Sequence, residues 1–365
     1  MAKKDISPLL GHLTRRIGER GPISFAEFME IALYHPEHGF YARSPIGEEG
    51  HFVTSPHVSP AFGDLVARQV AECWDLLGHP DPYRVVELGA GDGTLSAQIR
   101  TALRAVPDLE AATTLIAVER TPGQVAALEA AVATLAEAGP AHCVVANEVL
   151  DNVPFHRLRE RDGRVVEVFV GAEGDRLVEV EAEPAPEALA ALDRPLRSGE
   201  ERPVSPAASA LIAEVATALG PGYAFFFDYG FTGGEPAPPV HAYRGHEALA
   251  DVLAEPGERD VTAAVDLDAV AAVARGRGLQ VWGPVAQREA LLALGYRMWA
   301  SGVRKRQADA DAAGDHRAAL RFYEARSRAS ILIDEDKLGG LYLLTLGTEG
   351  LPPPAAVLGD RERGC

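Results

Sequence analysis

Three alternating glycines, Gly89, Gly91 and Gly93, constrain this chain more than any other feature, because they separate a short apolar run from an amphipathic one. The run at 84–88 is typical of a buried strand, and residues 94–106 place apolar side chains at helical spacing. Glycine permits a tight turn and lets a ligand approach the backbone, while a helix start presents free N–H groups. The sequence therefore predicts a strand–loop–helix unit with a ligand at the loop. A purely structural turn is the alternative.

Other apolar runs of strand length follow along the chain, at 114–119, 142–148 and 223–228. Such continuous runs belong in a sheet that helices cover on both faces. The predicted fold class is therefore α/β, with a Rossmann-like sheet. Dinucleotide-binding loops space their glycines as G-x-G-x-x-G, whereas this chain has G-x-G-x-G, which disfavours a nicotinamide oxidoreductase.

Residues 155–185 have a different pattern, because polar side chains dominate around two turn signals, Asp162-Gly163 and Glu173-Gly174. Dipeptides of this kind between short β-prone runs are typical of hairpins. We interpret this stretch as a β region inserted over the edge of the sheet.

The N-terminal part of the chain is predicted to be helical. A capping box runs from Ser24 to Glu27, and a second helix is expected to start at Ser59. The chain thus divides into five expected regions: an N-terminal helical and lid region (1–80), a first part of the Rossmann-like domain (81–154), an inserted β region (155–204), the remainder of that domain (205–350) and a flexible tail (351–365).

Composition narrows the classes of partner. The chain has 35 Lys and Arg against 53 Asp and Glu, a net charge of −18, which argues against nucleic acid as a partner. It has no apolar run long enough to span a membrane and no apolar N-terminal signal. With three cysteines at no metal-binding spacing, we expect a reducing compartment and a cytoplasmic location. His35, His38, His51 and His57 match no standard ligand pattern, so no metal is expected.

A second acidic feature supports a nucleoside ligand. Glu119 ends the strand that follows the glycine loop. A carboxylate in that position can accept hydrogen bonds from both hydroxyl groups of a ribose. The alternative for Glu119 taken alone is a solvated charge at a strand end.

A pair of carboxylates follows another strand, where open α/β sheets bind their ligands. Glu148 and Asp151 are three residues apart and share a face if that turn is helical. Paired carboxylates suit a cationic acceptor, since they can orient a guanidinium and take up the proton that a reacting nitrogen releases. Asp228 ends a further strand and is expected to face the same crevice. The alternatives are an acidic cap before a proline turn for the pair, and a turn aspartate for Asp228.

Taken in order, these and other segments resemble the MidA-like family of class I S-adenosylmethionine-dependent methyltransferases. A mitochondrial member of that family methylates an arginine side chain of a complex I subunit. The resemblance covers about residues 7–348 and is carried by Gly21-Pro22-Ile23-Ser24, His35-Pro36, Gly39-Phe40-Tyr41, 52–56, Phe62-Gly63, Val86-Glu87-Leu88-Gly89, 147–154, Asp228-Tyr229-Gly230, Tyr243-Arg244-Gly245-His246, Asp260-Val261-Thr262, Val265-Asp266 and Gln287. Many relatives have His where this chain has Ala264, which leaves the shape of the acceptor pocket open.

The resemblance implies S-adenosyl-L-methionine as methyl donor, with residues 39–55 as a lid over it. The cofactor-binding residues it implies are Tyr41, Thr54, Ser55, Glu87, Gly89, Ala90, Gly91, Gly93, Glu119, Asn147 and Glu148. The substrate-binding residues it implies are Asp151, Asn152, Tyr229, His246 and Gln287, with Glu148, Asp151 and Asp228 expected to be catalytic.

The sequence therefore predicts a methyltransferase that N-methylates a guanidinium, as arginine in a protein or as a free molecule. Two alternatives remain open: a small-molecule N- or O-methyltransferase of a biosynthetic pathway, and an assembly factor that binds the cofactor without turnover. The expected partner is a guanidinium-bearing acceptor, with no nucleic acid and no membrane. A homodimer is left open.

Overall fold

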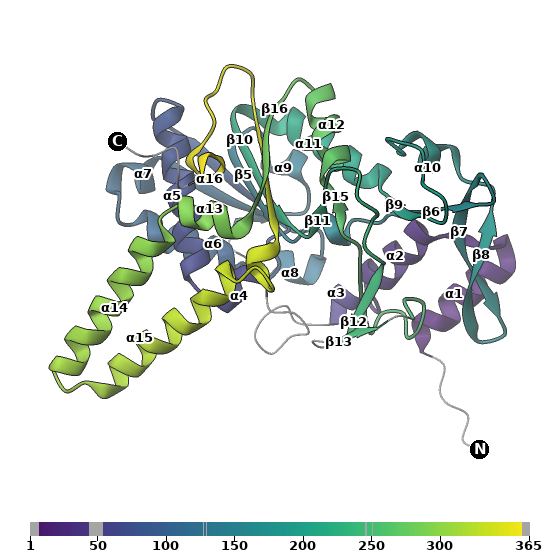
Figure 1. Ribbon diagram of the computed structural model, residues 1–365, viewed down its shortest axis with the longest axis horizontal. Helices are drawn as coiled ribbons and strands as arrows, with labels where there is room; N and C mark the ends of the chain where they lie inside the picture. The colour runs from purple at the N-terminus through teal and green to yellow at the C-terminus, as the bar shows by residue number, and fades with distance from the viewer. Residues whose placement is uncertain are drawn as a thin grey trace.

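A computed structural model of the chain describes residues 7–43, 54–126, 128, 130–244, 247–249 and 251–359. Figure 1 shows a large sheet covered by helices, a smaller β unit at one end and a projecting pair of helices at the other. Within the described residues, no helix has the length and apolarity needed to cross a membrane.

The central sheet has the strand order β16-β17-β10-β5-β2-β3-β4. The strands from β10 to β4 pair in parallel, whereas β17 is antiparallel to both of its neighbours. The predicted α/β class with a Rossmann-like sheet is confirmed. The strands are β2 (Tyr83–Leu88), β3 (Thr113–Val118), β4 (Ala131–Val132), β5 (Ala141–Asn147), β10 (Leu219–Asp228), β16 (Gln280–Ala286) and β17 (Tyr342–Gly347).

Strand β10 shows why apolar runs form this sheet. Successive side chains of a strand point to opposite faces, so an unbroken apolar run needs a core on each side. Phe225 and Phe227 pack into one hydrophobic core, and Phe226 packs into the other. Helices on the first face include α5 (Ala61–Leu76), α6 (Thr94–Leu103), α7 (Pro107–Ala112) and α13 (Gln287–Ala293), while α9 (Leu135–Ala138), α11 (Pro206–Ala218) and α12 (Leu267–Gly276) cover the second.

The predicted inserted β region forms a separate sheet and not a cover over the edge of the central one. One hairpin turns at Asp162-Gly163, as expected, and the other turns at Gly174-Asp175, one residue beyond the expected Glu173-Gly174. The sheet also takes in a two-residue strand from the N-terminal region, so insert and N-terminus form one unit. Its strands are β1 (Ile23–Ser24), β6 (His156–Arg161), β7 (Arg164–Glu173), β8 (Arg176–Ala182) and β9 (Glu201–Val204).

Three segments of the chain build the core of this second unit. Its buried side chains come from the N-terminal helices, from the insert and from a small three-stranded sheet within 241–262. These elements are α1 (Pro8–Arg20), α2 (Phe25–Tyr34), α3 (Phe40–Arg43), β12 (His241–Arg244), β13 (Glu247–Leu249) and β14 (Asp260–Thr262). Ser24 caps α2 by accepting from the N–H of Glu27, as the capping box predicts.

Two expected boundaries differ in the structure. Helix α5, assigned from the sequence to the N-terminal region, packs on the central sheet through the buried Phe62, Leu65 and Val66. Residues 351–359 were expected to be a flexible tail, but the short α16 (Ala355–Leu358) packs against α5. The reason is that Ala356 is buried and the carboxylate of Glu72 accepts from the N–H of Ala355.

The remaining elements connect these layers. Helices α14 (Tyr296–Ala312) and α15 (His316–Ala329) form the projecting pair, in which only Tyr296, Val303, Ala319 and Ala329 are buried. Short elements complete the described chain: α4 (Ser55–Val58), α8 (Pro122–Val125), η1 (Leu150–Asn152), α10 (Pro186–Ala190), β11 (Gly230–Phe231), β15 (Val265–Asp266), η2 (Ser330–Ile333) and η3 (Leu338–Gly340).

The close pairing of β10 with β5 gives a test of the fold. A Cβ atom on Gly222 would lie 2.1 Å from the backbone oxygen of His142, so Gly222→Ala forces the two strands apart. We expect the free energy of unfolding to fall by about 1–3 kcal/mol, as in other overpacked sites. Gly220→Ala is the matched control, because its Cβ would lie at an ordinary 3.6 Å from Ala141. Equal denaturation midpoints for the two variants would contradict the pairing.

Candidate active site

The glycine loop is fixed by the end of the neighbouring strand. The N–H groups of Gly89 and Ala90 donate to the backbone oxygen of Val118, at 2.8 and 3.1 Å. Gly89 has φ +70°, and a Cβ there would lie 2.6 Å from a methyl carbon of Val149. A glycine is therefore needed at this position for both conformation and space.

The side chain of Glu119 binds the backbone of the glycine loop. One carboxylate oxygen accepts from the N–H of Gly91 at 2.9 Å, and the other accepts from Thr121 at 2.8 Å. A carboxylate oxygen can accept more than one hydrogen bond, so each oxygen keeps capacity for a ligand hydroxyl. Glu119 is not among the described residues that line the adjacent cavity, and its role toward a ribose stays a prediction.

Glu87 lies at the end of β2, beside the loop, with only 4% of its surface exposed. The hydroxyl of Ser96, in the first turn of α6, donates to its carboxyl group. Burial raises the pKa of Glu87 to about 8, although the bond from Ser96 acts in the opposite direction. The group is therefore largely protonated at neutral pH.

A cavity of about 540 Å³ opens over the loop and the strand ends. This volume falls within the range of small-molecule sites. The cavity brings together eleven residues predicted for the site: Tyr41, Thr54, Glu87, Gly89, Ala90, Gly91, Asn147, Glu148, Asp151, Asn152 and Tyr229. It also takes in residues that were not predicted, among them His57, Asp92, His241, Tyr243, Asp260 and Thr262.

Glu148 follows β5 in a backbone conformation that is rare outside glycine, with φ +53°. Its N–H donates to the backbone oxygen of Phe227 at 2.7 Å, which fixes that conformation. One carboxylate oxygen accepts from the N–H of Ser55 at 3.2 Å and from the amide of Asn147 at 2.9 Å. Burial raises the pKa of Glu148, and strain of this kind is typical of functional sites.

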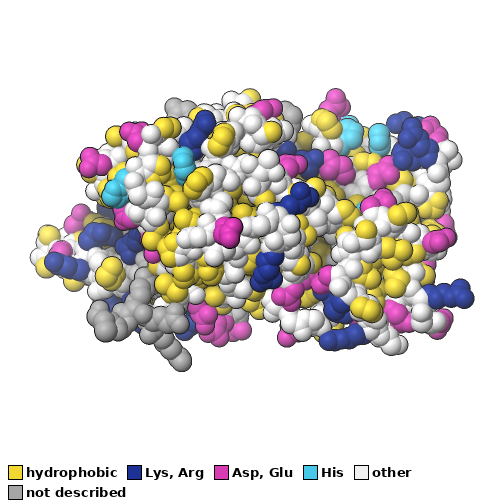
Figure 2. All heavy atoms as spheres, turned by 90° about the horizontal axis from the view of Figure 1, so that it is seen from above, with side chains coloured by type: hydrophobic (Ala, Val, Ile, Leu, Met, Phe, Trp, Pro, Cys, Tyr) yellow, Lys and Arg dark blue, Asp and Glu magenta, His cyan; other side chains and the backbone are white. Residues whose placement is uncertain are grey.

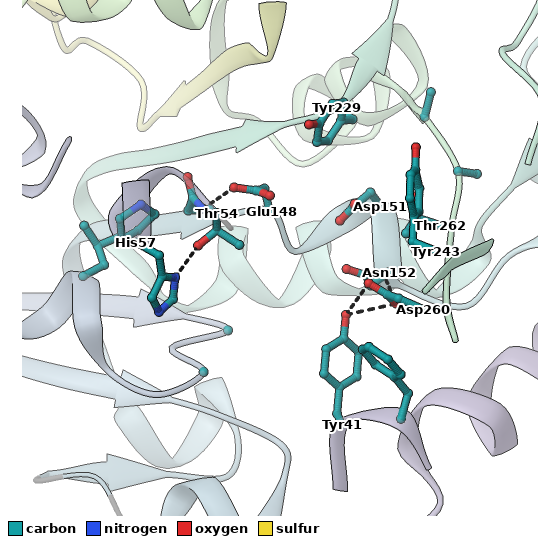
Figure 3. Close-up of a pocket in the computed structure, with 18 of the residues that line it drawn as sticks. Tyr41, Thr54, His57, Glu148, Asp151, Asn152, Tyr229, Tyr243, Asp260 and Thr262 are labelled. Carbon is teal, nitrogen blue, oxygen red and sulfur yellow. Dashed lines mark hydrogen bonds between the residues drawn. The ribbon is translucent and has the colours of Figure 1, made fainter. Parts of the chain in front are cut away.

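Asp151 lies in η1 with one buried carboxyl oxygen that has no hydrogen-bond partner among the described atoms. Burial raises its pKa well above the usual value, and the charges of Asp228 and Asp260 act in the same direction. Glu148 and Asp151 both line the cavity, as Figure 3 shows. The two carboxyl groups that the sequence spacing predicts to act together therefore line the same cavity.

The expectation that Asp228 faces the crevice needs correction. Its carboxyl group lies behind the wall, with 1% of the residue exposed. It accepts from the N–H groups of Val149 and Leu150, at 3.0 and 2.7 Å, and from its neighbour Tyr229. Its own hydrogen bonds therefore favour a positioning role for this residue.

Tyr41, Asn152 and Asp260 form a cluster on the far wall of the cavity (Figure 3). The amide of Asn152 donates to Asp260 at 3.0 Å, and the hydroxyl of Tyr41 lies 3.3 Å from both carboxyl oxygens. Burial raises the pKa of Asp260 to about 7. The sequence contributed Asp260 only as part of a family segment, since no motif spacing connects it to residues a hundred positions away.

The segment that leads into α4 is tied to the glycine loop. The hydroxyl of Thr54 lies 2.8 Å from one ring nitrogen of His57, and the other ring nitrogen lies 3.0 Å from Asp92. Residues 44–53, the middle of the predicted lid, lie outside the described residues. Sequence reasoning considered His57 only as a metal ligand, and no group of three or more potential metal ligands occurs in the described part of the chain.

Other predicted site residues lie elsewhere. Ser55 and Gln287 are buried beneath the wall, where the hydroxyl of Ser55 donates to the Gln287 side chain at 3.3 Å. Gly93 is the N-cap residue of α6 and is not among the described residues that line the cavity. His246, predicted to bind substrate, falls outside the described residues, whereas Ala264 lines the cavity.

Comparison with known proteins decides the family. Residues 65–285 match a family model described as "Putative S-adenosyl-L-methionine-dependent methyltransferase", which is more than half of the chain. The chain belongs to this methyltransferase family. The resemblance to the MidA-like class I methyltransferases found from the motifs is confirmed.

Named relatives agree with this assignment. The chain is 30% identical over 332 residues to "Protein arginine methyltransferase NDUFAF7, mitochondrial" of Mus musculus, covering 80% of this chain and 74% of that protein. The Drosophila melanogaster homologue is 31% identical, covering 76% and 73%. These relatives are mitochondrial proteins, so the predicted cytoplasmic location, which rested on cysteine content and the lack of an apolar signal, is wrong.

A solved structure agrees on both fold and ligand. A crystal structure from Burkholderia thailandensis, bound to S-adenosyl-homocysteine, matches with a TM-score of 0.79 and 26% identity, covering 97% of this chain and 95% of that one. A second structure from the same organism matches with a TM-score of 0.78 and 27% identity. The predicted cofactor, S-adenosyl-L-methionine, is thereby confirmed.

The residues present fit that cofactor. The side-chain oxygen of Asn147 is buried without a partner among the described atoms, so it can accept from an ammonium group such as that of a methionine. Gly89 and Gly91 leave the loop backbone open to close approach. That the methionine part binds at this loop and Asn147 stays a prediction.

The raised pKa of Glu87 predicts how stability depends on pH. The folded protein holds this proton more tightly than the unfolded chain, so the contribution is complete at low pH and is lost as pH rises to about 8. Without ligand, the free energy of unfolding should fall between pH 5 and 8 by up to about 1.4 kcal/mol per pH unit for this proton. Asp228 and Asp260, whose pKa values burial raises to about 7, add to the same trend.

Glu87→Gln should flatten this slope without removing it, because Asp228 and Asp260 still titrate. The variant should fold, because the amide oxygen can still accept from Ser96. Denaturant titrations at several pH values measure the effect. Glu187→Gln, on the exposed surface of α10, is the control and should keep the full slope. A slope that is the same in all three proteins would contradict the assignment to Glu87.

Proposed function

We propose that this methyltransferase transfers a methyl group to a guanidinium nitrogen, as found in arginine. One observation carries the proposal: Glu148, Asp151 and Asp260 line one cavity, and no Lys or Arg is among its described lining residues. The relatives named protein arginine methyltransferase support the same acceptor.

The charge balance of the cavity favours a cation over a neutral acceptor. A buried charge is costly unless it is paired, and these carboxyl groups respond by raised pKa values. A guanidinium presents a planar fork of N–H donors that matches carboxylates in two-point contacts. A hydroxyl acceptor would bring no positive charge of its own, so only the sulfonium of the donor would offset the negative charge.

The chemistry divides between donor and protein. When bound, S-adenosylmethionine supplies an electrophilic methyl group on a sulfonium. Glu148 and Asp151 hold the plane of the guanidinium so that one nitrogen faces that methyl group, which lowers the barrier by positioning. When the new N–C bond forms, the methyl–sulfur bond would break and leave a neutral thioether, while a carboxylate would take up the proton that the nitrogen releases. Burial raises the pKa of Glu148, which makes this group a suitable proton acceptor.

Charge also bears on the partners. The net charge of −18 supports the prediction that nucleic acid is not a partner, and on the face in Figure 2 acidic and basic side chains are intermixed. The possible homodimer is tested by the mass of the purified protein in solution.

We predict that Glu148→Gln and Asp151→Asn keep cofactor affinity but slow methyl transfer to arginine peptides. Each amide keeps the shape of the side chain and removes a charge-assisted contact worth about 1.5–3 kcal/mol, a loss of roughly 10- to 100-fold. Single-turnover rates with methyl-labelled donor measure it, beside calorimetric binding of S-adenosylhomocysteine. Glu187→Gln serves again as an exposed control.

Three outcomes would point elsewhere. Full activity in both variants excludes the carboxylate mechanism. Label that passes only to small amines or hydroxyl compounds supports a biosynthetic methyltransferase. Tight binding of S-adenosylhomocysteine with no transfer to arginine peptides or to lysate proteins supports an assembly factor without turnover.

A further inference from the structure

We propose that Asp260 is an acceptor-binding residue, which pairs with Asp151 to hold the guanidinium between two carboxylates. The proposal rests on the function proposed above and adds a residue to it. Asp260 belongs to the second unit, on β14, whereas Asp151 follows the central sheet, in η1. The acceptor would thus be held at the seam between the two units.

Burial and hydrogen bonds fix the position of Asp260. The residue is 4% exposed, and it lines the cavity opposite Glu148 (Figure 3). The amide of Asn152 donates to one carboxyl oxygen at 3.0 Å, which fixes the orientation of the group. The adjoining backbone is tied to η1 as well, because the N–H of Ala263 donates to the oxygen of Asp151 at 3.3 Å.

The contact from Tyr41 is weak enough to be replaced. Its hydroxyl lies 3.3 Å from both oxygens of Asp260, longer than the usual 2.5–3.0 Å for O–H···O bonds. A charged N–H donor binds a carboxylate more strongly than a neutral hydroxyl does. A guanidinium can therefore take the place of the Tyr41 hydroxyl without leaving Asp260 unpaired.

Asp151 supplies the independent observation. One of its oxygens is buried, lacks a partner among the described atoms and belongs to a residue on the cavity wall. A buried acceptor of this kind costs free energy unless a ligand donates to it. Asp151 and Asp260 line the same cavity, so a single planar cation could donate hydrogen bonds to both carboxylates, one from each of two edges.

The other groups around Asp260 leave this charge unbalanced. Tyr41 on α3, Tyr243 on β12 and Glu148 after β5 supply hydroxyl or further carboxyl groups. Arg120 stacks on the ring of Tyr34 at 3.7 Å, pairs with Glu30 at 2.6 Å and is not among the described lining residues. With no Lys or Arg among those residues, the carboxyl groups favour a cationic acceptor.

The pH dependence of acceptor binding distinguishes a binding role of Asp260 from a purely structural one. Burial raises the pKa of Asp260 to about 7, so the group is largely neutral at pH 6 and largely charged at pH 8. A guanidinium favours the charged form and therefore binds more tightly as pH rises through this range. Binding at pH 7 should also release a proton to the buffer.

The experiment uses the full chain saturated with methyl-labelled S-adenosylmethionine and a degenerate arginine pentapeptide mixture as acceptor. We expect Asp260→Asn to raise KM at least 10-fold while kcat changes less than 3-fold and S-adenosylhomocysteine affinity is unchanged. In the wild type, KM should fall from pH 6 to pH 8, and in Asp260→Asn this trend should be much weaker.

Stability and cofactor affinity separate binding from anchoring. If Asp260 serves only to anchor α3 through Tyr41, Asp260→Asn lowers the denaturation midpoint and the S-adenosylhomocysteine affinity along with the rise in KM, which overturns the proposal; if Asp260 binds the acceptor, both stay at the wild-type values. Wild-type KM in Asp260→Asn also overturns it. If Asp260→Asn does not fold, the pH trend of the wild-type KM decides. A wild type that methylates no arginine peptide and no lysate arginine defeats the proposed function, and this proposal with it.

Discussion

The carboxyl group of Asp228 lies between the ends of β10 and β5 and accepts hydrogen bonds from the backbone of Val149 and Leu150. Val149 and Leu150 lie between Glu148 and Asp151 in the turn that carries the acidic pair. Because the turn is held there, Glu148 keeps a backbone conformation that costs about 1–3 kcal/mol in ordinary sequences. The same constraint brings Asp151, three residues later, to the same cavity. A residue that touches no ligand thus determines where two acidic groups of the site lie.

Burial of acidic groups sets the energetic character of the site. Glu87, Glu148, Asp151, Asp228 and Asp260 all have raised pKa values, and burial is the largest cause in each case. Each group opposes folding at alkaline pH, since its ionisation is harder in the folded state. A bound cation offsets that cost, so acceptor binding and stability are coupled. An active site that destabilises the free protein is a common consequence of selection for function.

Sequence patterns found the parts of the site that are local in the chain. The glycine loop and the 147–154 segment each follow a strand, and the carboxyl ends of parallel strands meet at one edge of a sheet. Tertiary packing determined the rest. Asp228 has the right position for a site residue, and only its hydrogen bonds to Val149 and Leu150 reveal a positioning role. Asp260 reaches the site because β14 packs with the N-terminal unit, a contact that no spacing encodes.

The division of labour between the two units explains why the family motifs are scattered. The cofactor side is built within the central sheet, by the loop after β2 and the end of β5. The wall that we propose binds the acceptor takes Tyr41 from the N-terminal helices and Asp260 from the small sheet, two segments far apart in the chain. A change on that wall alters acceptor recognition while the sheet and its donor site stay intact. Ala264 lines the same cavity, and because the family resemblance implies His at this position in many relatives, we expect its small side chain to leave more room for the acceptor.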